Sequence, residues 1–248
     1  MTALRSIIFN ILFYGLWTPL ICISMAPCLL LPRGFTVWVA DFYQDGTYYL
    51  EKYILNLTYE VRGLEYRPAR DEPYLAACKH YSAYETLKLY PLFGDPTIVL
   101  KRELLSLPLF GWFLKKLDVI AIDRGNRETA MSSLISGAQH MKAARRPIVI
   151  FPQGTRVRVD ATTQEKPYKG GIVKLYVATG LPIIPLATNS GLYWPRNSFW
   201  KKSGKVIFEF LPPIEPGLPG TDVIKILEEK IETASNRLVE EGRKALAG

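Results

Sequence analysis

Short apolar runs alternate with stretches of helical periodicity along residues 57–211, and this alternation constrains the fold more than any other feature of the chain. The runs are LTYEVRGLEY, PYLAAC, TIVLK, DVIAID, PIVIF, LPIIPLA and KVIFEFL. Continuous apolar runs of this length are typical of strands buried on both faces, and strands that alternate with helices form mostly parallel sheets. The sequence therefore predicts an α/β fold with a mixed, largely parallel sheet flanked by helices.

Two helices that cover this sheet are indicated by their apolar stripes. In residues 127–145 the stripe consists of Met131, Leu134, Ala138 and Met141. In the last helix, for which Thr221 is the expected cap, it consists of Ile224, Leu227, Ile231, Ala234 and Leu238. Spacings of three and four residues place such side chains on one helix face. No internal repeat, low-complexity tract or long linker marks a second soluble domain.

The N-terminal segment carries no formal charge from residue 6 to residue 31. About 20 apolar residues suffice for a helix to span a bilayer. Pro19 and Pro27 divide the run into pieces that are each too short, so a kinked or re-entrant hairpin in one leaflet competes with a single tilted span. A cleaved signal peptide ranks well behind, because Arg5 alone forms the basic region and Pro27 disfavours a cleavage site. We therefore expect a retained membrane anchor.

The segment that follows, residues 35–55, is rich in aromatic residues and poor in charge. Aromatic rings concentrate at the headgroup level of membranes, and a core-facing helix is an equal alternative. These patterns predict two parts in the chain. Residues 1–55 form a helical, membrane-anchoring segment, and residues 56–248 form the globular domain.

The chain is basic, with 31 Lys and Arg against 23 Asp and Glu, and this balance favours an anionic partner such as nucleic acid, a membrane surface or a phosphorylated substrate. The pair Lys201–Lys202 is a candidate for such surface contact. The three cysteines, Cys22, Cys28 and Cys78, lack C-x-x-C spacing, which argues against a disulfide framework and a zinc site. A reducing, cytosolic face fits this cysteine usage.

His80 lies in KHYSAYETLKLY, directly after the run PYLAAC, and therefore at the carboxyl end of an expected strand. Open α/β sheets bind their ligands at this edge. Ser82 and Glu85 match the S-x-x-E capping box of a helix start. Glu85 either caps only, or also fixes the His80 ring as a general base, and spacing alone does not decide. A thiol–imidazole pair with Cys78 is a weaker alternative, since free cysteines in apolar strands are usually core residues.

A second group of polar residues follows the run PIVIF, in FPQGTR. Gly154 allows close backbone approach, Thr155 offers a hydroxyl, and Arg156 offers a planar cation, which together can bind a phosphate. Lys101 in VLKREL and Arg124 in AIDRGN are further cations after expected strands. Each signal is weak alone, because many α/β loops end in Gly and Arg.

Taken in order, the blocks KHYSAYE, VLKRELLSLPLFGW, AIDRGN, FPQGTR and LPIIPLA resemble those of the glycerolipid (lysophospholipid) acyltransferase family, and most closely its members that act on 1-acylglycerol 3-phosphate. The resemblance covers about residues 57–215. The family pattern has H-x-x-x-x-D and F-P-E-G-T-R, so this chain departs from it at Glu85 and Gln153. The glutamate keeps the carboxylate one methylene further out, whereas the glutamine removes a charge beside Arg156.

The resemblance implies an acyltransferase that uses His80 to deprotonate the hydroxyl of a lysophospholipid, with Glu85 holding the imidazole. It implies that the acceptor phosphate is bound by Gly154, Thr155 and Arg156, with Lys101 and Arg124 as secondary candidates. It also implies lysophosphatidate, acyl-CoA or acyl carrier protein and membrane lipids as partners, with no nucleic acid and neither a metal nor another cofactor. The active site is then expected at the cytoplasmic face of a membrane. Two alternatives stay open, namely another lyso-lipid acceptor such as a lyso-aminolipid, and a membrane lipid-binding protein without catalysis.

Overall fold

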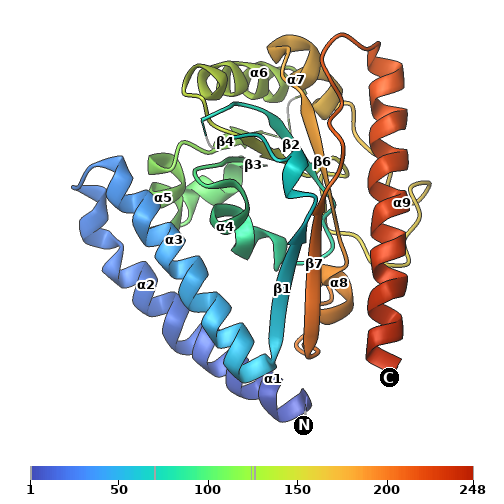
Figure 1. Cartoon of the computed structure of the whole chain (residues 1–248). Coiled ribbons are helices and arrows are strands. Elements are labelled where there is room, and N and C mark those ends of the chain that lie inside the picture. The colour runs from blue at the N-terminus through green and yellow to red at the C-terminus, as the bar shows by residue number, and fades with distance from the viewer. Residues whose placement is uncertain (1, 70, 124, 126, 248) are drawn as a thin grey trace.

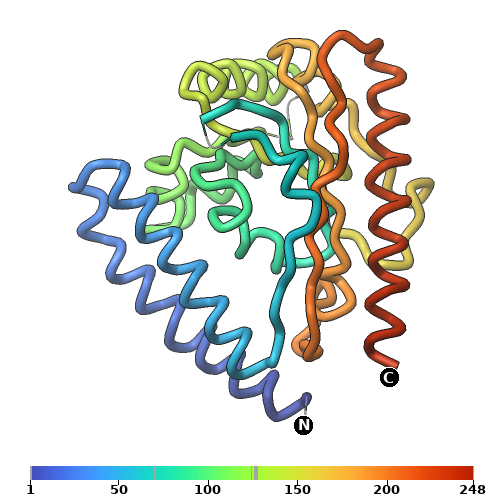
Figure 2. Tube along the Cα trace, in the orientation of Figure 1, coloured from blue at the N-terminus to red at the C-terminus, as the bar shows by residue number. Residues whose placement is uncertain are grey.

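The computed structural model describes residues 2–69, 71–123, 125 and 127–247. It shows a central seven-stranded sheet between two layers of helices (Figure 1). An N-terminal helical hairpin and α4 lie on one side, while α6, α7 and the long C-terminal α9 lie on the other. Both termini lie at the same end of the molecule (Figure 2).

Each of the apolar runs forms a strand, as the sequence predicted. The strands are β1 Leu57–Arg62, β2 Leu75–Cys78, β3 Thr97–Lys101, β4 Ile120–Ile122, β5 Ile148–Ile150, β6 Ile183–Thr188 and β7 Gly204–Phe210. Their order in the sheet is β1-β7-β6-β2-β5-β3-β4. All neighbouring pairs are parallel except β6 and β7, which are antiparallel. The prediction of a mixed, largely parallel sheet is therefore confirmed.

The strand at the centre of the site, β2, is buried on both faces. Leu75 and Ala77 pack in the core cluster on the side of α6, α7 and α9, whereas Ala76 and Cys78 pack in the cluster on the hairpin side. This alternation follows from the two-residue period of a strand. It leaves no polar group inside β2, so the chemistry of this strand begins only beyond its carboxyl end.

Three helices lie behind the sheet, and the sequence predicts apolar stripes for the first and the last of them. They are α6 Arg127–Ala143, α7 Gly171–Thr179 and α9 Gly220–Ala247. In α6, Leu134, Ala138 and Met141 are buried. Helix α9 buries Leu227, Ile231, Ala234 and Leu238, but it begins at Gly220, so the predicted cap Thr221 lies inside the helix.

The N-terminal hairpin consists of two antiparallel helical arms. The first arm comprises α1 Thr2–Asn10, a π-helical segment Ile11–Trp17, α2 Thr18–Ser24 and a 3-10 turn Ala26–Leu29. The second comprises α3 Arg33–Leu50 and a π-helical segment Glu51–Leu55. The prediction that Pro19 cuts the first arm is wrong. Pro19 stands in the first turn of α2, directly after the wide π-helical segment, where a missing N–H is tolerated.

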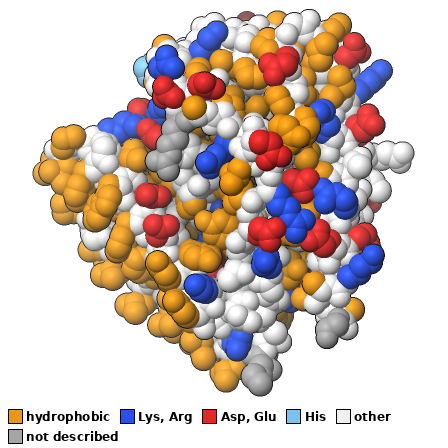
Figure 3. Space-filling view, in the orientation of Figure 1, with side chains coloured by type: hydrophobic (Ala, Val, Ile, Leu, Met, Phe, Trp, Pro, Cys, Tyr) orange, Lys and Arg blue, Asp and Glu red, His pale blue; other side chains and the backbone are white. Residues whose placement is uncertain are grey.

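The hairpin has one face packed on the sheet and one face exposed. Phe9 and Phe13 are buried in the same core cluster as Leu186 and Phe208 of the sheet. On the outer face, exposed apolar and aromatic side chains include Ile8, Ile11, Leu16, Leu20, Ile23, Phe35, Trp38, Phe42, Tyr49 and Tyr53. Figure 3 shows hydrophobic side chains gathered over this part of the molecule. The core-facing interpretation of the aromatic segment holds for Tyr43, which packs inward, whereas Trp38 faces outward and its contact with lipid headgroups stays a prediction.

Short elements complete the chain. They are the 3-10 turns Leu64–Tyr66, Glu85–Lys88 and Arg102–Ser106 and the helices α4 Leu89–Phe93, α5 Phe110–Lys116 and α8 Ser190–Tyr193. The turn Glu85–Lys88 contacts the hairpin through a fully buried ion pair, in which the Lys88 ammonium lies 2.6 Å from a Glu51 carboxylate oxygen. The hairpin and the sheet thus share both an apolar core and a buried charge pair.

Candidate active site

The predicted site residues follow the carboxyl ends of neighbouring parallel strands. His80 follows β2, the FPQGTR loop follows β5, and Lys101 ends β3, which pairs with β5. Sheet topology thus brings the first two groups together and places the exposed Lys101 one strand further along. The remaining candidate, Arg124, lies outside the described residues.

Glu85 contacts the His80 ring. The distance between His80 Nδ1 and Glu85 Oε2 is 3.2 Å, and the ring stacks on that of Phe151, with 3.8 Å between the centroids. The side chain of His80 is 13% exposed, whereas that of Glu85 is 3% exposed. One ring nitrogen is therefore held against a buried carboxylate, and Nε2 is left for another partner.

Glu85 also caps the turn in which it lies. Its carboxylate accepts hydrogen bonds from the backbone amides of Tyr81, at 3.1 Å, and Ser82, at 3.0 Å, and from the hydroxyl of Ser190. The Ser82 hydroxyl accepts a bond from the amide of Tyr84. The capping box is present, although a 3-10 turn follows it rather than the α-helix the motif predicts. Glu85 can cap the turn and contact His80 at the same time, because its carboxylate oxygens have separate lone pairs for the backbone amides and for the imidazole.

Cys78 does not form the alternative thiol–imidazole pair. The residue ends β2 and is 2% exposed, and its thiol faces the backbone oxygen of Ala76. Burial raises the pKa of the Cys78 thiol far above its ordinary value. The thiol therefore stays protonated and serves as a small core residue.

The FPQGTR loop is tied directly to His80 by a backbone hydrogen bond from the amide of Val157 to the carbonyl oxygen of His80, at 2.9 Å. Gly154 has a φ of +68°, which favours glycine. A Cβ at Gly154 would lie 3.1 Å from the ammonium of Lys169. Lys169 therefore lies across Gly154, and sequence reasoning missed it, because its only signal was the motif YKGG.

The unusual Gln153 has a structural partner. Its side chain is buried, and its amide nitrogen donates a hydrogen bond to the carbonyl oxygen of Lys166 over 2.9 Å. An ionised glutamate has no proton to donate there. The glutamine thus fixes the loop from Gly154 to Lys166. Among the described residues, none forms an ion pair with the guanidinium of Arg156. The backbone carbonyl of Arg156 accepts a hydrogen bond from the Arg196 side chain.

A buried polar group lies beside His80 on the side of α9. The Lys79 ammonium is 2.5 Å from Glu232 Oε1, and the hydroxyl of Tyr168 donates to the same oxygen over 2.7 Å. Burial lowers the pKa of Lys79, and the adjacent carboxylate of Glu232 opposes that change. These contacts fasten the His80 turn to α9.

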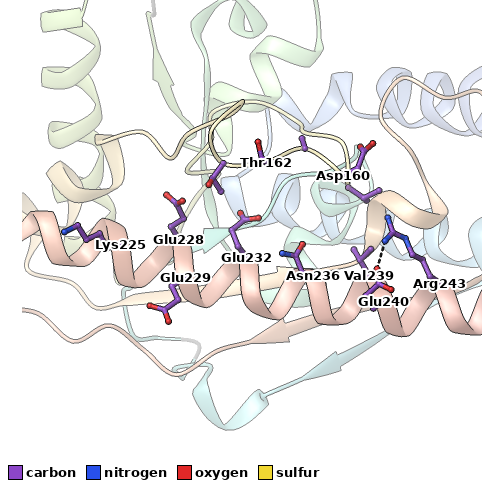
Figure 4. Close-up of a pocket in the computed structure, with 13 residues that line it drawn as sticks. Asp160, Thr162, Lys225, Glu228, Glu229, Glu232, Asn236, Val239, Glu240 and Arg243 are labelled. Carbon is purple, nitrogen blue, oxygen red and sulfur yellow. Dashed lines mark hydrogen bonds and ion pairs between the residues drawn. The ribbon is translucent and has the colours of Figure 1, made fainter.

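Glu232 also lines a separate cleft of about 700 Å³ between α9 and the loop of residues 159–163 (Figure 4). Its acidic lining residues are Asp160, Glu228, Glu229, Glu232 and Glu240, against two cations, Lys225 and Arg243. An excess of carboxylates repels anions. This cleft is therefore unsuited to a phosphate-bearing ligand, which the cationic FPQGTR loop suits better.

Two further findings concern the surroundings of the site. The arm Thr2–Leu29 has 28 residues, and an 18-residue window within it has a mean hydropathy of 1.8, so by length and composition it can cross a membrane. Lys201, a predicted surface residue, is instead 3% exposed. Its ammonium donates to the Asn10 side chain over 2.5 Å and lies near the rings of Phe9 and Trp194.

Within the described residues, no group of three or more His, Cys, Asp or Glu side chains is placed to hold a metal ion. The arrangement instead provides an imidazole oriented by a buried carboxylate next to a loop with cationic side chains. Such a pair can remove a proton from a hydroxyl, and such a loop can bind a phosphate.

Comparison with known proteins agrees with this chemistry. The family model Acyltransferase matches residues 58–189. A 1-acyl-sn-glycerol-3-phosphate acyltransferase of Pseudomonas aeruginosa is 32% identical over 233 residues, which cover 93% of this chain and 88% of that protein. An Escherichia coli protein of the same name is 30% identical over 170 residues, or 65% and 68% of the two chains.

The fold is also similar to a crystal structure. A 1-acyl-sn-glycerophosphate acyltransferase from Thermotoga maritima superposes with a TM-score of 0.77 at 18% identity, covering 96% of this chain and 99% of that one. Because the family model spans more than half of the chain and the Pseudomonas aeruginosa relative aligns over most of it, the chain belongs to the acyltransferase family.

Proposed function

We propose that this enzyme transfers a fatty acyl group from an acyl thioester to the free hydroxyl of lysophosphatidate, giving phosphatidate for phospholipid synthesis. The names of the relatives suggest the acceptor, because they are called 1-acyl-sn-glycerol-3-phosphate acyltransferases. The observation that carries the proposal is the contact between His80 and Glu85 beside a cationic loop.

In this mechanism, His80 acts as the general base through Nε2. Its Nδ1 donates to Glu85, which fixes the tautomer that leaves Nε2 unprotonated. As the acceptor oxygen attacks the thioester carbonyl, its proton passes to Nε2 and the imidazolium is stabilised by Glu85. The tetrahedral intermediate then collapses, the C–S bond breaks, and the imidazolium returns the proton to the leaving thiolate.

The acceptor phosphate is held by Arg156 together with Gly154 and Thr155. A guanidinium can form two parallel, charge-assisted hydrogen bonds to a phosphate. Lys101 and Lys169 add positive charge at the same edge of the sheet. Binding at this loop orients the acceptor for attack, because the loop is bonded to the backbone of His80.

The exposed apolar face of the hairpin inserts into the membrane that supplies the acceptor, with the active site on the cytoplasmic face. Residues 1–55 then form the membrane-anchoring segment and residues 56–248 the acyltransferase domain. Either acyl-CoA or acyl carrier protein is the donor, and no metal takes part. The buried contacts of the first arm with the sheet make the anchor part of the folded domain.

An acyl-transfer assay of the purified protein tests the proposal. It uses lysophosphatidate, a lyso-aminolipid and other lyso-lipids as acceptors, each with acyl-CoA and with acyl carrier protein as donor. Phosphatidate formed in preference to other products is the expected result. Preference for a phosphate-free acceptor would assign another acyltransferase activity, and binding without turnover would indicate a lipid-binding protein.

A further inference from the structure

The carboxylate of Glu85 has a second side-chain partner besides His80, namely Ser190, which lies 105 residues further along the chain. Ser190 begins α8, directly after β6, and β6 pairs with β2 on the side opposite β5. The ends of three adjacent strands therefore supply Ser190, His80 and the FPQGTR loop. Ser190 is fully buried, and its hydroxyl donates to Oε1 of Glu85.

The two oxygens of Glu85 share the backbone amide of Ser82, which lies 3.2 Å from Oε1 and 3.0 Å from Oε2, and differ in their other partners. Oε2 faces Nδ1 of His80, whereas Oε1 accepts from Ser190 and from the amide of Tyr81. A glutamate has one more rotatable bond than the aspartate of the family pattern, so more conformational freedom is lost when its carboxylate is fixed. A donor on Oε1 restricts the rotation that would carry Oε2 away from the imidazole.

The backbone around Ser190 is built for this approach. A Cβ at Gly191 would lie 2.7 Å from Val159 and 2.8 Å from the Cβ of Tyr81, so only glycine lets α8 pack this closely against the His80 turn. The side chain of the preceding residue, Asn189, is held by two hydrogen bonds. Its oxygen accepts from the backbone amide of Ile207, and its nitrogen donates to the backbone carbonyl of Leu238. The position of Ser190 is thus set by the His80 turn, the loop at Val159, β7 and α9.

We infer that Ser190 is a positioning residue for acyl transfer, which holds Glu85 so that His80 keeps the tautomer with a proton on Nδ1. The expected effect of Ser190 on the rate rests on the proposed function, whereas its expected effect on the His80 tautomer does not. The hydrogen-bond chain runs from Ser190 through Glu85 to His80. Ser190 acts through Glu85, because it is fully buried and its hydroxyl is bonded to that carboxylate.

The test combines kinetics with histidine spectroscopy. Ser190→Ala is expected to lower kcat by about 10- to 100-fold, because the orientation of the base is lost, while KM for the acceptor changes less than about twofold. In a Glu85→Gln background the same substitution should add less than about twofold, since both act through one chain. Ser190→Thr, which keeps the hydroxyl, should recover part of the rate. Ser203→Ala is the control, as it removes a serine hydroxyl that donates to the backbone carbonyl of Leu55 away from the site.

The spectroscopic part does not depend on any substrate. The chain has two histidines, and His140 is exposed on α6, so nitrogen-15 labelling of histidine with a His140→Gln reference resolves the His80 ring. Wild type should show a proton on Nδ1 and none on Nε2 at pH 8, and Ser190→Ala should shift His80 toward the Nε2-protonated tautomer. An unchanged tautomer, or rate losses that multiply with those of Glu85→Gln, would overturn the inference.

If Ser190→Ala does not fold, Ser190→Cys, with its weaker donor, takes its place in both measurements. Failure of the proposed function would appear separately, as absence of wild-type turnover with an intact tautomer.

Discussion

The backbone amide of Val157 donates a hydrogen bond to the carbonyl oxygen of His80 over 2.9 Å. This bond joins two motifs that are separated by more than seventy residues in the sequence. The bond therefore fixes the backbone of the proposed base against the residue that follows the proposed phosphate loop. Substitutions in the loop can be interpreted as effects on the acceptor, provided that this bond is retained.

Arg156→Ala is expected to weaken the acceptor interaction by about 1.5–3 kcal/mol, since charge-assisted hydrogen bonds to the phosphate are lost. In kcat/KM for lysophosphatidate this corresponds to roughly a 10- to 150-fold loss, and Arg156→Lys should restore only part of it, because lysine lacks the bidentate geometry. Initial rates against both substrates measure the effect. An increase in KM for the donor alone would contradict the assignment of Arg156 to the acceptor phosphate.

Glu85→Gln should reduce kcat by about 100-fold or more, because a neutral amide does not stabilise the imidazolium. Glu85→Asp should retain activity within about tenfold, because it keeps the charge and matches the family pattern. Steady-state kinetics on folded variants distinguish the two cases. Equal activity of Glu85→Gln and wild type would mean that the carboxylate only caps the turn.

The buried Lys201 gives a pH dependence of stability. Burial lowers the pKa of its ammonium to about 8, from an ordinary value of 10.5, and among the described residues no carboxylate pairs with it. Between these values the unfolded chain binds more protons, so this group contributes stability that rises with pH. We expect the free energy of unfolding of wild type, minus that of Lys201→Met, to increase from pH 7.5 to pH 9.5.

Chemical denaturation of both proteins in one detergent measures this difference across the pH range. Tyrosines affect both proteins alike and cancel in the subtraction. A difference that stays constant or decreases with pH would show that the ammonium is solvated. Lys202→Met is a matched control, because Lys202 is exposed.

Polar substitutions on the outer face of the hairpin should release the protein from membranes without unfolding it. Ile11, Ile23 and Trp38 are 64%, 68% and 56% exposed, so the triple serine variant removes little packing within the protein. Binding to vesicles that contain anionic lipid, followed by sedimentation, measures the effect. Deletion of residues 1–31 is a poorer test, because it also removes Phe9 and Phe13 from the core. Undiminished vesicle binding by the serine variant would reject the hairpin as the membrane contact.

The strands, and the placement of His80 and the FPQGTR loop each at the carboxyl end of a strand, could be predicted from the sequence, because both depend on local pattern. Strand order could not, since β1 and β7 pair across the length of the globular domain. The helical path through Pro19 depends on a π-helical segment without a sequence signal.

Residues that act through tertiary contacts also escaped prediction. Ser190, Lys169 and the pair Glu51–Lys88 meet their partners only in the folded chain. The sequence places Lys201 at the surface, where lysine usually lies, yet it is buried beneath Phe9 and Tyr14 of the hairpin and beside Trp194. Residue type alone therefore does not predict the burial of charged residues at the contact between the hairpin and the sheet.

The central claim is that His80 is the base for acyl transfer to lysophosphatidate, and mass-spectrometric detection of phosphatidate tests it most directly. Purified wild type and His80→Ala are each incubated with lysophosphatidate and an acyl thioester, after circular dichroism has shown equal folding. The account predicts phosphatidate from wild type and a rate about a hundredfold to ten-thousandfold lower for His80→Ala. Phosphatidate formed by the two proteins at similar rates would contradict it.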